Sequence, residues 1–304
     1  MPRLLRLLLS GGEPFLRDDL PEICALFHED AKVSHITIPT NASMPRSIEE
    51  KTRAILESCR GAYVNVSLSL DALGEKRDGL VKKEGSFKSF RETYERLKDL
   101  KNDHDNLGVG VITTMNAKNQ DDIIEIYEYA IRELRVDNFG FNVVRGKPKD
   151  PRIKEIDIAR YKELTEMVIE DTRQGRSGRM NIPLFNLFLA KRDLLYDIYY
   201  RTYTQDRYLI PCYSGKIRGV MDERGNVFPC ETYMYKAPEL GFGNLRDFSY
   251  DFGALWDSRK AKGIRERISS TKCYCSHECD LTTNILFNPL LLPRLLKESV
   301  KYYL

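Results

Sequence analysis

The sequence has no strong excess of charge of either sign. Its 304 residues include 48 Lys and Arg against 45 Asp and Glu, which leaves a formal net charge of +3. Basic and acidic side chains are mixed throughout, which gives no reason to expect nucleic acid as a partner. No apolar stretch is long enough to cross a bilayer. The apolar run Leu4–Leu9 is interrupted by Arg6 and no small-residue cleavage site follows it, so we expect a cytoplasmic protein without a signal peptide.

Paired cysteines at the short spacing of a zinc ribbon are also missing. Five of the seven cysteines nevertheless lie within one stretch and read Cys212-x17-Cys230, then Cys273-x-Cys275-x3-Cys279. Thiolates this close together repel one another unless a cation or cluster neutralises them, so we predict a metal centre. Thiolate ligands suit zinc and iron–sulfur clusters almost equally. Disulfides are the alternative, and the otherwise intracellular character of the chain disfavours them.

The segment between the first two of these cysteines predicts a hairpin. Residues 216–221 and 226–230 can pair as strands across the turn 222–225, which would bring Cys212 close to Cys230. We interpret His277, inside the second group, as a polar loop residue. Cys24 and Cys59 lie on apolar helical stripes and are predicted to be core thiols.

The first half of the chain alternates strand with helix. Buried strands are predicted at residues 4–9, 35–39, 64–70, 107–113 and 139–144. Strands that are each followed by a helix or loop imply an α/β protein with a parallel sheet. Ser47 with Glu50 predicts a capping box, and Asn119 predicts another helix start. The Gly- and Lys-rich stretch after Asp71 is predicted to be a loop.

Polar residues and glycines recur where these strands end. Each alone has an ordinary explanation as a turn, a helix cap or a surface charge. Their coincidence at successive strand ends favours a ligand site, because barrels of this kind bind ligands at the carboxyl ends of their strands. The residues concerned are Gly11, Gly12, Glu13, Asn41, Ser69, Asp71, Asn116 and Arg145.

Two of these motifs together resemble a known family. Residues 7–17, Leu-Leu-Leu-Ser-Gly-Gly-Glu-Pro-Phe-Leu-Arg, resemble the second strand and Gly-Gly-Glu-Pro motif of radical S-adenosylmethionine (SAM) enzymes. Cys212-x12-Gly225-x4-Cys230 resembles the opening of the family's SPASM/twitch extension, which holds an auxiliary [4Fe–4S] cluster. The resemblance implies a partial (β/α) TIM-type barrel that lacks its first strand, followed by a small cysteine-rich α+β domain. The implied segments are a barrel at 1–155, a helical connection at 156–210, a SPASM/twitch domain at 211–290 and a C-terminal helix at 291–304.

The resemblance also implies roles for individual residues. Gly11, Gly12 and Glu13 would hold the methionine amino group of SAM, partly through close backbone approach at the glycines. Pro14 and Asn41 are also expected to be cofactor-binding residues. Ser69 and Asp71 would be near the ribose or carboxylate, and Asn116 and Arg145 would line the cofactor or substrate side. Cys212, Cys230 and two of Cys273, Cys275 and Cys279 would bind the auxiliary cluster, with Cys275 and Cys279 preferred.

One family motif has no counterpart in the sequence. Radical SAM enzymes carry a Cys-x3-Cys-x2-Cys loop for a second [4Fe–4S] cluster upstream of Gly-Gly-Glu-Pro, and only ten residues, none of them cysteine, precede Gly11. We expect an N-terminally truncated chain rather than a degenerate relative, and do not expect residues 1–304 to cleave SAM alone.

Three functions remain open on the sequence. The first is a radical SAM enzyme that, in full-length form, generates a 5′-deoxyadenosyl radical to abstract hydrogen, favouring a peptide or protein substrate and receiving electrons from a ferredoxin or flavodoxin. The second is a noncatalytic scaffold with a structural metal knot. The third is an iron–sulfur electron-transfer subunit whose barrel another chain completes.

Overall fold

The computed structural model describes residues 3–302. The chain divides into two compact units, Met1–Phe185 and Asn186–Leu304, called here the half-barrel and the cysteine unit. The outermost predicted segments reach into residues 1–2 and 303–304, which lie outside the described residues. The four-segment division expected from the sequence stays a prediction.

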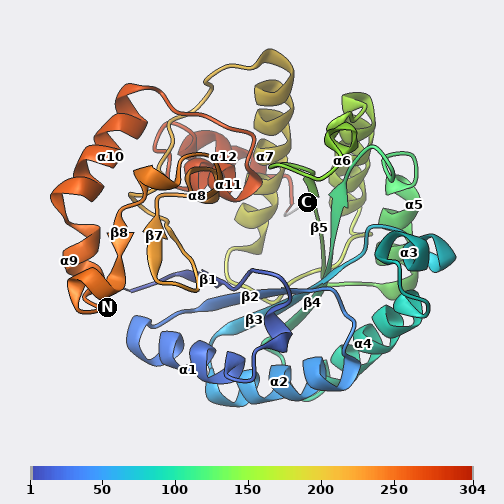
Figure 1. Ribbon diagram of the computed structural model, residues 1–304. Helices are drawn as coiled ribbons and strands as arrows, with labels where there is room; N and C mark the ends of the chain where they lie inside the picture. Colours follow the sequence, from blue (N-terminus) through green and yellow to red (C-terminus); the bar gives the residue numbers. More distant parts are fainter. Residues whose placement is uncertain (1–2, 303–304) are drawn as a thin grey trace. The chain divides into compact units, whose positions relative to one another are not determined.

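Within the described part of the half-barrel, five parallel strands form one sheet in the order β1-β2-β3-β4-β5 (Figure 1). The strands are β1 (Arg6–Leu8), β2 (His35–Thr40), β3 (Tyr63–Ser69), β4 (Leu107–Met115) and β5 (Asn138–Val143). Each strand pairs with the next one in the chain, because the intervening helices return the chain to the starting edge. The predicted α/β class and partial (β/α) barrel are therefore confirmed.

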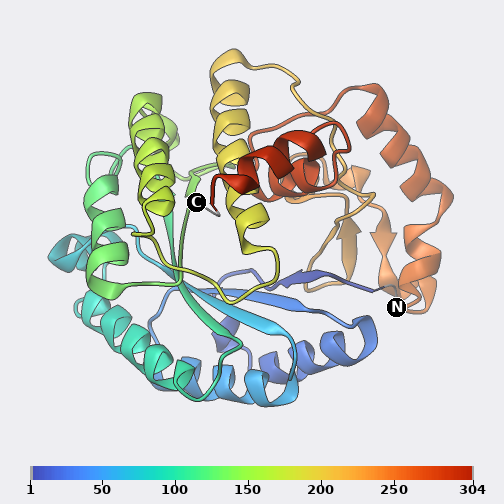
Figure 2. The same cartoon turned by 180° about the vertical axis from the view of Figure 1, so that it is seen from behind.

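Helices cover the apolar face of this sheet. Figure 1 and Figure 2 show α1, α2 and α4 side by side along it. The apolar strand residues Ile36, Val64 and Val111 are fully buried, and so are Cys24 and Cys59, as predicted for core thiols. The helices are α1 (Leu20–Ala31), α2 (Pro45–Ser58), α3 (Gly74–Val81), α4 (Ser86–Lys101), α5 (Ile123–Glu128), which continues as a π-helix through Tyr129–Leu134, and α6 (Ile158–Arg173).

The opposite face of the sheet is polar. Asn65 and Ser67 alternate along β3 with buried valines, and Asn65 Nδ2 donates to Ser67 Oγ at 2.8 Å. Asn138 of β5 reaches across β4 and donates to Asn65 Oδ1 at 2.7 Å. Gly110 makes this reach possible, because a side chain there would begin 2.3 Å from Asn138 Oδ1. The strand-end site thus continues into a hydrogen-bonded polar surface.

We expect Gly110→Ala to lower the free energy of unfolding by about 1–3 kcal/mol, because the added methyl group collides with the Asn138 amide. Urea denaturation of the full chain measures the change. Gly140→Ala is the matched control, since the nearest atom there, Ile112 Cγ1, is 4.0 Å away. Asn138→Ala should relieve most of the loss in a double variant. Equal stability of the two glycine variants would contradict this packing.

Three local predictions in the half-barrel are wrong. The capping box at Ser47 and Glu50 does not form, because α2 begins earlier at Pro45 with Met44 as its N-cap; proline is favoured in the first turn, where its missing N–H is not needed. Asn119 caps no helix. It accepts a hydrogen bond from the Asn116 amide instead, and α5 begins later. The stretch expected to be a loop contains α3.

The cysteine unit contains mainly helices and one small sheet. Within its described residues the sheet is antiparallel in the order β6-β7-β8, and Val220 pairs with Phe228 in the predicted hairpin. Val227, Phe242 and Leu255 form part of a hydrophobic core against which Cys212 and Cys273 pack. The elements are α7 (Phe185–Gln205), β6 (Val220–Met221), β7 (Asn226–Phe228), α8 (Glu231–Lys236), β8 (Gly243–Asn244), α9 (Phe252–Trp256), α10 (Arg259–Ser270), α11 (Glu278–Leu286) and α12 (Leu292–Val300).

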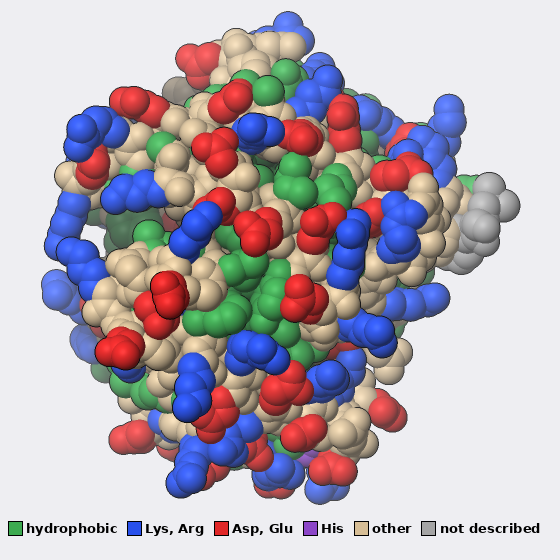
Figure 3. Space-filling view, turned by 90° about the vertical axis from the view of Figure 1, so that its right-hand side faces the viewer, with side chains coloured by type: hydrophobic (Ala, Val, Ile, Leu, Met, Phe, Trp, Pro, Cys, Tyr) green, Lys and Arg blue, Asp and Glu red, His purple; other side chains and the backbone are tan. Residues whose placement is uncertain are grey.

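Surface charges are interspersed. On the face that Figure 3 displays, Lys and Arg side chains lie among Asp and Glu side chains, as the nearly balanced composition leads one to expect. Within the described residues, no helix has both the length and the apolar character needed to span a membrane.

Candidate functional site

The carboxyl edge of the sheet brings the predicted strand-end residues into one row. Gly11 and Gly12 follow β1, Asn41 follows β2, and Asp71 follows β3. Asn116 and Arg145 follow β4 and β5 in the same way. Because the strands are parallel and adjacent, all of these residues lie at one edge of the half-barrel.

The Gly-Gly-Glu-Pro turn is anchored by its glutamate. The Glu13 carboxylate accepts hydrogen bonds from Thr40 Oγ1 at 2.9 Å and from the Asn41 amide at 2.6 Å, both at the end of β2. Gly11 has φ +138°, and no other group lies within 4 Å of the place where a side chain would begin at Gly11 or Gly12. The glycine backbone is therefore open to a ligand, while Glu13 positions the turn. Pro14 follows in a buried 3-10 turn.

Arg77 joins the next two strand ends, and sequence reasoning missed it. This arginine lies on α3 and is only 4% exposed. Its guanidinium donates to the Ser69 carbonyl at 2.7 Å and to the Asn41 carbonyl at 2.9 Å. Burial lowers the pKa of Arg77, and the charge of Asp71 opposes that shift. The guanidinium lies 5.0 Å from the centre of the Phe90 ring. No pattern near Arg77 in the sequence indicates this position.

Asp71 continues the row toward β4. Its carboxylate accepts a hydrogen bond from the Thr114 amide at 2.6 Å, and its carbonyl accepts one from Asn119 Nδ2 at 3.0 Å. Burial raises the pKa of Asp71, although the Thr114 hydrogen bond and the Arg77 charge lower it in part. Asn116 is buried, and its side chain closes its own turn by accepting from the Lys118 amide. These two residues therefore shape the edge of the site.

Ser69 and Arg145 complete the row of strand-end residues. The Ser69 side chain is half-buried at the end of β3, on the polar face of the sheet. Arg145 is exposed beyond β5. Both are placed where a ligand at the carboxyl edge could reach them.

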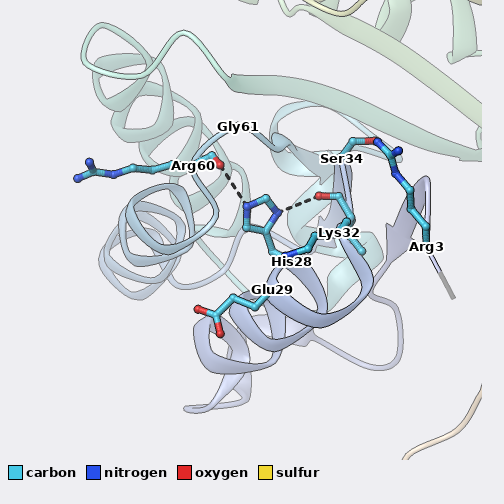
Figure 4. Close-up of a pocket in the computed structure, with 8 residues that line it drawn as sticks. Arg3, His28, Glu29, Lys32, Ser34, Arg60 and Gly61 are labelled. Carbon is cyan, nitrogen blue, oxygen red and sulfur yellow. Dashed lines mark hydrogen bonds between the residues drawn. The ribbon is translucent and has the colours of Figure 1, made fainter. Parts of the chain in front are cut away.

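A cavity of about 370 Å³ lies at the opposite, amino-terminal edge of the sheet. In Figure 4 the His28 ring lies between two backbone carbonyls, those of Val33 at 2.9 Å and Arg60 at 3.1 Å. The Arg60 and Glu29 side chains point away from the ring. Because its charged groups diverge, this cavity is less suited to a specific ligand than the carboxyl edge.

Four thiols of the cysteine unit form a mutually interacting set. Cys273 interacts electrostatically with Cys212, Cys230 and Cys275, and the remaining pairs among these four also interact. Cys212, Cys273 and Cys275 line one small cavity. The hairpin thus brings Cys230 within range of Cys212, as its pattern predicted. Cys279 lies within electrostatic reach of Arg218.

The thiols differ in their tendency to ionise. A hydrogen bond with the Cys273 thiol lowers the pKa of Cys212 to about 6, although burial opposes the shift. The same hydrogen bond, together with burial, raises the pKa of Cys273. Burial is the main cause that raises the pKa values of Cys230 and Cys275 to about 12. One thiolate shared between Cys212 and Cys273 is therefore favoured over several neighbouring charges.

All seven cysteines are free thiols. Within residues 3–302, no three His, Cys, Asp or Glu side chains converge in the arrangement of a single metal ion's ligands. His277 lies in the loop before α11, as interpreted from the sequence. It is 4% exposed, and its Nε2 lies 2.5 Å from Glu231 Oε2.

Part of the chain is similar to known protein sequences. The family model described as "Radical SAM superfamily" matches residues 2–130. Fe-coproporphyrin III synthase of Methanosarcina barkeri is 28% identical over 171 residues, which make up 55% of this chain and 39% of that protein. The chain therefore matches well under half of that relative's length.

Solved structures share the fold. A histidine-tagged anSMEcpe with bound AdoMet has a TM-score of 0.59 and 17% identity, and the match covers 98% of this chain and 78% of that one. Native anSMEcpe with bound AdoMet and Kp18Cys peptide has a TM-score of 0.56 and 16% identity, over 98% and 82% of the two chains. SuiB of Streptococcus suis has a TM-score of 0.56 and 19% identity, over 86% and 57%. At these identities the likeness concerns the fold alone.

Proposed function

We propose that this chain, whose residues 2–130 match the family model of the radical SAM superfamily, supplies the SAM-binding edge and the auxiliary-cluster unit of a radical SAM/SPASM-type iron–sulfur protein. Reductive cleavage of SAM, where the radical cluster is also present, would supply a 5′-deoxyadenosyl radical that abstracts hydrogen from the substrate. The observation that carries the proposal is the grouping of four thiols in the cysteine unit.

The SAM-binding part of the proposal rests on the carboxyl edge. The open backbone of Gly11 and Gly12 would accept the methionine end of SAM, with Glu13 and Pro14 holding the turn in place. Asn41, whose amide is bonded to Glu13, would lie beside that end. The remaining candidates, farther along the row, would face the ribose, the carboxylate or the substrate: Ser69, Asp71, Asn116 and Arg145.

The donor set of the cysteine unit fits a [4Fe–4S] cluster. Four thiolates are the usual ligands of such a cluster, and Cys212, Cys230, Cys273 and Cys275 interact with one another in the fold. Bound at these residues, the cluster would supply electron transfer or structural support. Cys279, four residues after Cys275, is the alternative fourth ligand.

The radical cluster does not fit the cysteines of the half-barrel. Cys24 and Cys59 are both fully buried, and burial raises the pKa of each thiol. The sequence contains no Cys-x3-Cys-x2-Cys stretch. Cleavage of SAM therefore requires a cluster held by residues other than these, with a ferredoxin or flavodoxin as the expected electron donor in the cytoplasm.

The favoured substrate is a peptide or protein side chain. Proteins of the same fold are described with bound peptides, namely anSMEcpe with the Kp18Cys and Cp18Cys peptides. A tetrapyrrole is the second candidate, because the curated relative in sequence is named a coproporphyrin synthase. Titration of the full chain with each class of compound, followed by absorbance and calorimetry, would distinguish the two.

The proposal is tested by purifying the full chain without oxygen and measuring iron, sulfide and zinc. We expect about four irons and four sulfides per chain, because an all-thiolate set of four holds one cubane cluster. Equilibrium dialysis with labelled SAM tests the half-barrel separately, and Gly12→Val should abolish the binding by closing the open backbone.

Other results would support the other functions. About one zinc per chain without sulfide, even after reconstitution, would overturn the auxiliary cluster and favour a structural zinc knot on a scaffold. An intact cluster without any SAM binding would favour an electron-transfer subunit instead.

A further inference from the structure

A buried carboxylate lies at the centre of the cysteine unit. Asp280, on α11, is 0% exposed. Its Oδ1 accepts a hydrogen bond from Ser214 Oγ at 2.8 Å and lies 3.3 Å from an Arg218 guanidinium nitrogen. Its Oδ2 lies 3.4 Å from His277 Nδ1. A carboxylate so far from water needs such partners, because an unpaired buried charge is strongly unfavourable.

Most residues that contact Asp280 or His277 lie within two positions of a cysteine in the sequence. Ser214 is two residues after Cys212, and Asp280 directly follows Cys279. His277 lies between Cys275 and Cys279, and Glu231, which bonds to the His277 ring, directly follows Cys230. We call Ser214, Arg218, Glu231, His277 and Asp280 the Asp280 network. Each cysteine-bearing segment is therefore tied to the others through a residue beside its thiol.

These ties are made between protein side chains. They join segments up to 66 positions apart, as in the bond between Ser214 and Asp280. Arg218 adds a charge to this framework, because its guanidinium interacts electrostatically with Cys279 and Cys230 as well as with Asp280. The Arg218 side chain is 17% exposed, so water screens that charge only in part.

Two atoms of the network still lack hydrogen bonds. His277 Nδ1 and Asp280 Oδ2 are buried, and neither makes a hydrogen bond within the described residues, although they face one another. Buried polar atoms normally have a hydrogen-bond partner. Because these two atoms do not bond to each other, the other contacts of the network hold His277 and Asp280 in place.

We propose that the Asp280 network is a frame that holds the cysteine segments in ligand geometry, and that Arg218 stabilises the reduced form of the bound cluster. This inference rests on the proposed auxiliary cluster. The residues of the network are positioning residues, since they act through the cysteines beside them. Outer partners of metal ligands commonly change metal affinity about 10–100-fold when removed.

The first test uses cobalt(II) as a probe for the metal-free chain. Thiolate-to-cobalt charge-transfer absorbance reports how many cysteines bind, independently of cluster assembly. We expect Asp280→Asn to weaken cobalt binding about 10–100-fold, whereas Asp247→Asn, at an exposed position of the same unit, leaves it unchanged. Ser214→Ala removes a single hydrogen bond and serves if Asp280→Asn fails to fold.

The second test measures the reduction potential of the reconstituted cluster. Arg218→Met should move the midpoint potential to more negative values, because the reduced cluster carries one more negative charge and loses a nearby cation. Arg218→Lys should restore most of the shift. A role confined to folding would change the amount of cluster formed and leave its potential unchanged.

The outcomes separate the two proposals. Unchanged cobalt affinity in Asp280→Asn and Ser214→Ala overturns the frame, whether or not the cluster is present. An unchanged potential in Arg218→Met overturns the charge role. If the wild-type chain takes up no iron and sulfide but its cobalt affinity depends on Asp280, the auxiliary cluster fails and the frame remains.

Discussion

Substitution of Arg77 by methionine is expected to lower the free energy of unfolding of the half-barrel by about 3–6 kcal/mol. The change removes two charged hydrogen bonds, to the Ser69 and Asn41 carbonyls, and each such bond contributes about 1.5–3 kcal/mol. It also leaves both carbonyls without that donor at the edge where SAM is proposed to bind. We therefore expect SAM affinity to fall by about tenfold or more, which corresponds to about 1.4 kcal/mol.

Hydrogen exchange measured by mass spectrometry on the full chain tests this expectation, because it reports the ends of β2 and β3 separately from the cysteine unit. Lys76→Met is the matched control. Lys76 is the preceding residue, its side chain is 66% exposed, and its ion pair with Asp122 contributes little. Arg77→Lys should retain one of the two hydrogen bonds and give an intermediate value. Equal exchange in Arg77→Met and Lys76→Met would refute the anchoring role.

Loss of any one of four thiols is expected to remove most of the iron from the cysteine unit. Alanine at Cys212, Cys230, Cys273 or Cys275 leaves three thiolates for a cluster that takes four, so iron should fall from about four per chain to less than about one. Cys279→Ala should retain the cluster, because the four mutually interacting thiols would still supply four thiolates. Iron and sulfide analysis after anaerobic reconstitution measures the result.

Cys59→Ala is the control for loss of a thiol as such. It removes a fully buried sulfur of the half-barrel and should leave iron unchanged. The opposite result in the cysteine unit is equally informative. If Cys279→Ala loses iron while Cys273→Ala keeps it, the ligand pair is Cys275 and Cys279, the pair that the sequence analysis preferred. If none of the five cysteine-to-alanine variants of the cysteine unit loses iron, the auxiliary cluster is contradicted.

The strands of the half-barrel were predictable because their signal is local. Short apolar runs such as the one ending at Leu9, and the alternation of Val66 with Ser67, need only neighbouring residues to be recognised. Helix starts were less predictable. Ser47 and Glu50 have the correct spacing for a capping box, but Pro45 begins α2 one turn earlier. Several start signals compete within a few residues, and packing of the helix decides among them.

The candidate site was predictable in its residues and only partly in their roles. Glu13 was expected to contact the methionine end of SAM, and in the fold its carboxylate holds Thr40 and Asn41. Arg77 escaped notice because its stretch was read as a loop, and nothing near it in sequence indicates that its guanidinium reaches two strand ends.

By itself, the sequence determined the α/β class, the order of the strand ends, the glycine turn and the five cysteines that can bind metal. These follow from patterns over a few residues and from side-chain chemistry. Only the tertiary structure decided that Cys212, Cys230, Cys273 and Cys275 interact with one another, and that Asp280 is tied to Ser214, 66 positions away. Such contacts depend on how the hairpin and α11 pack together, and long-range packing leaves no mark in local sequence.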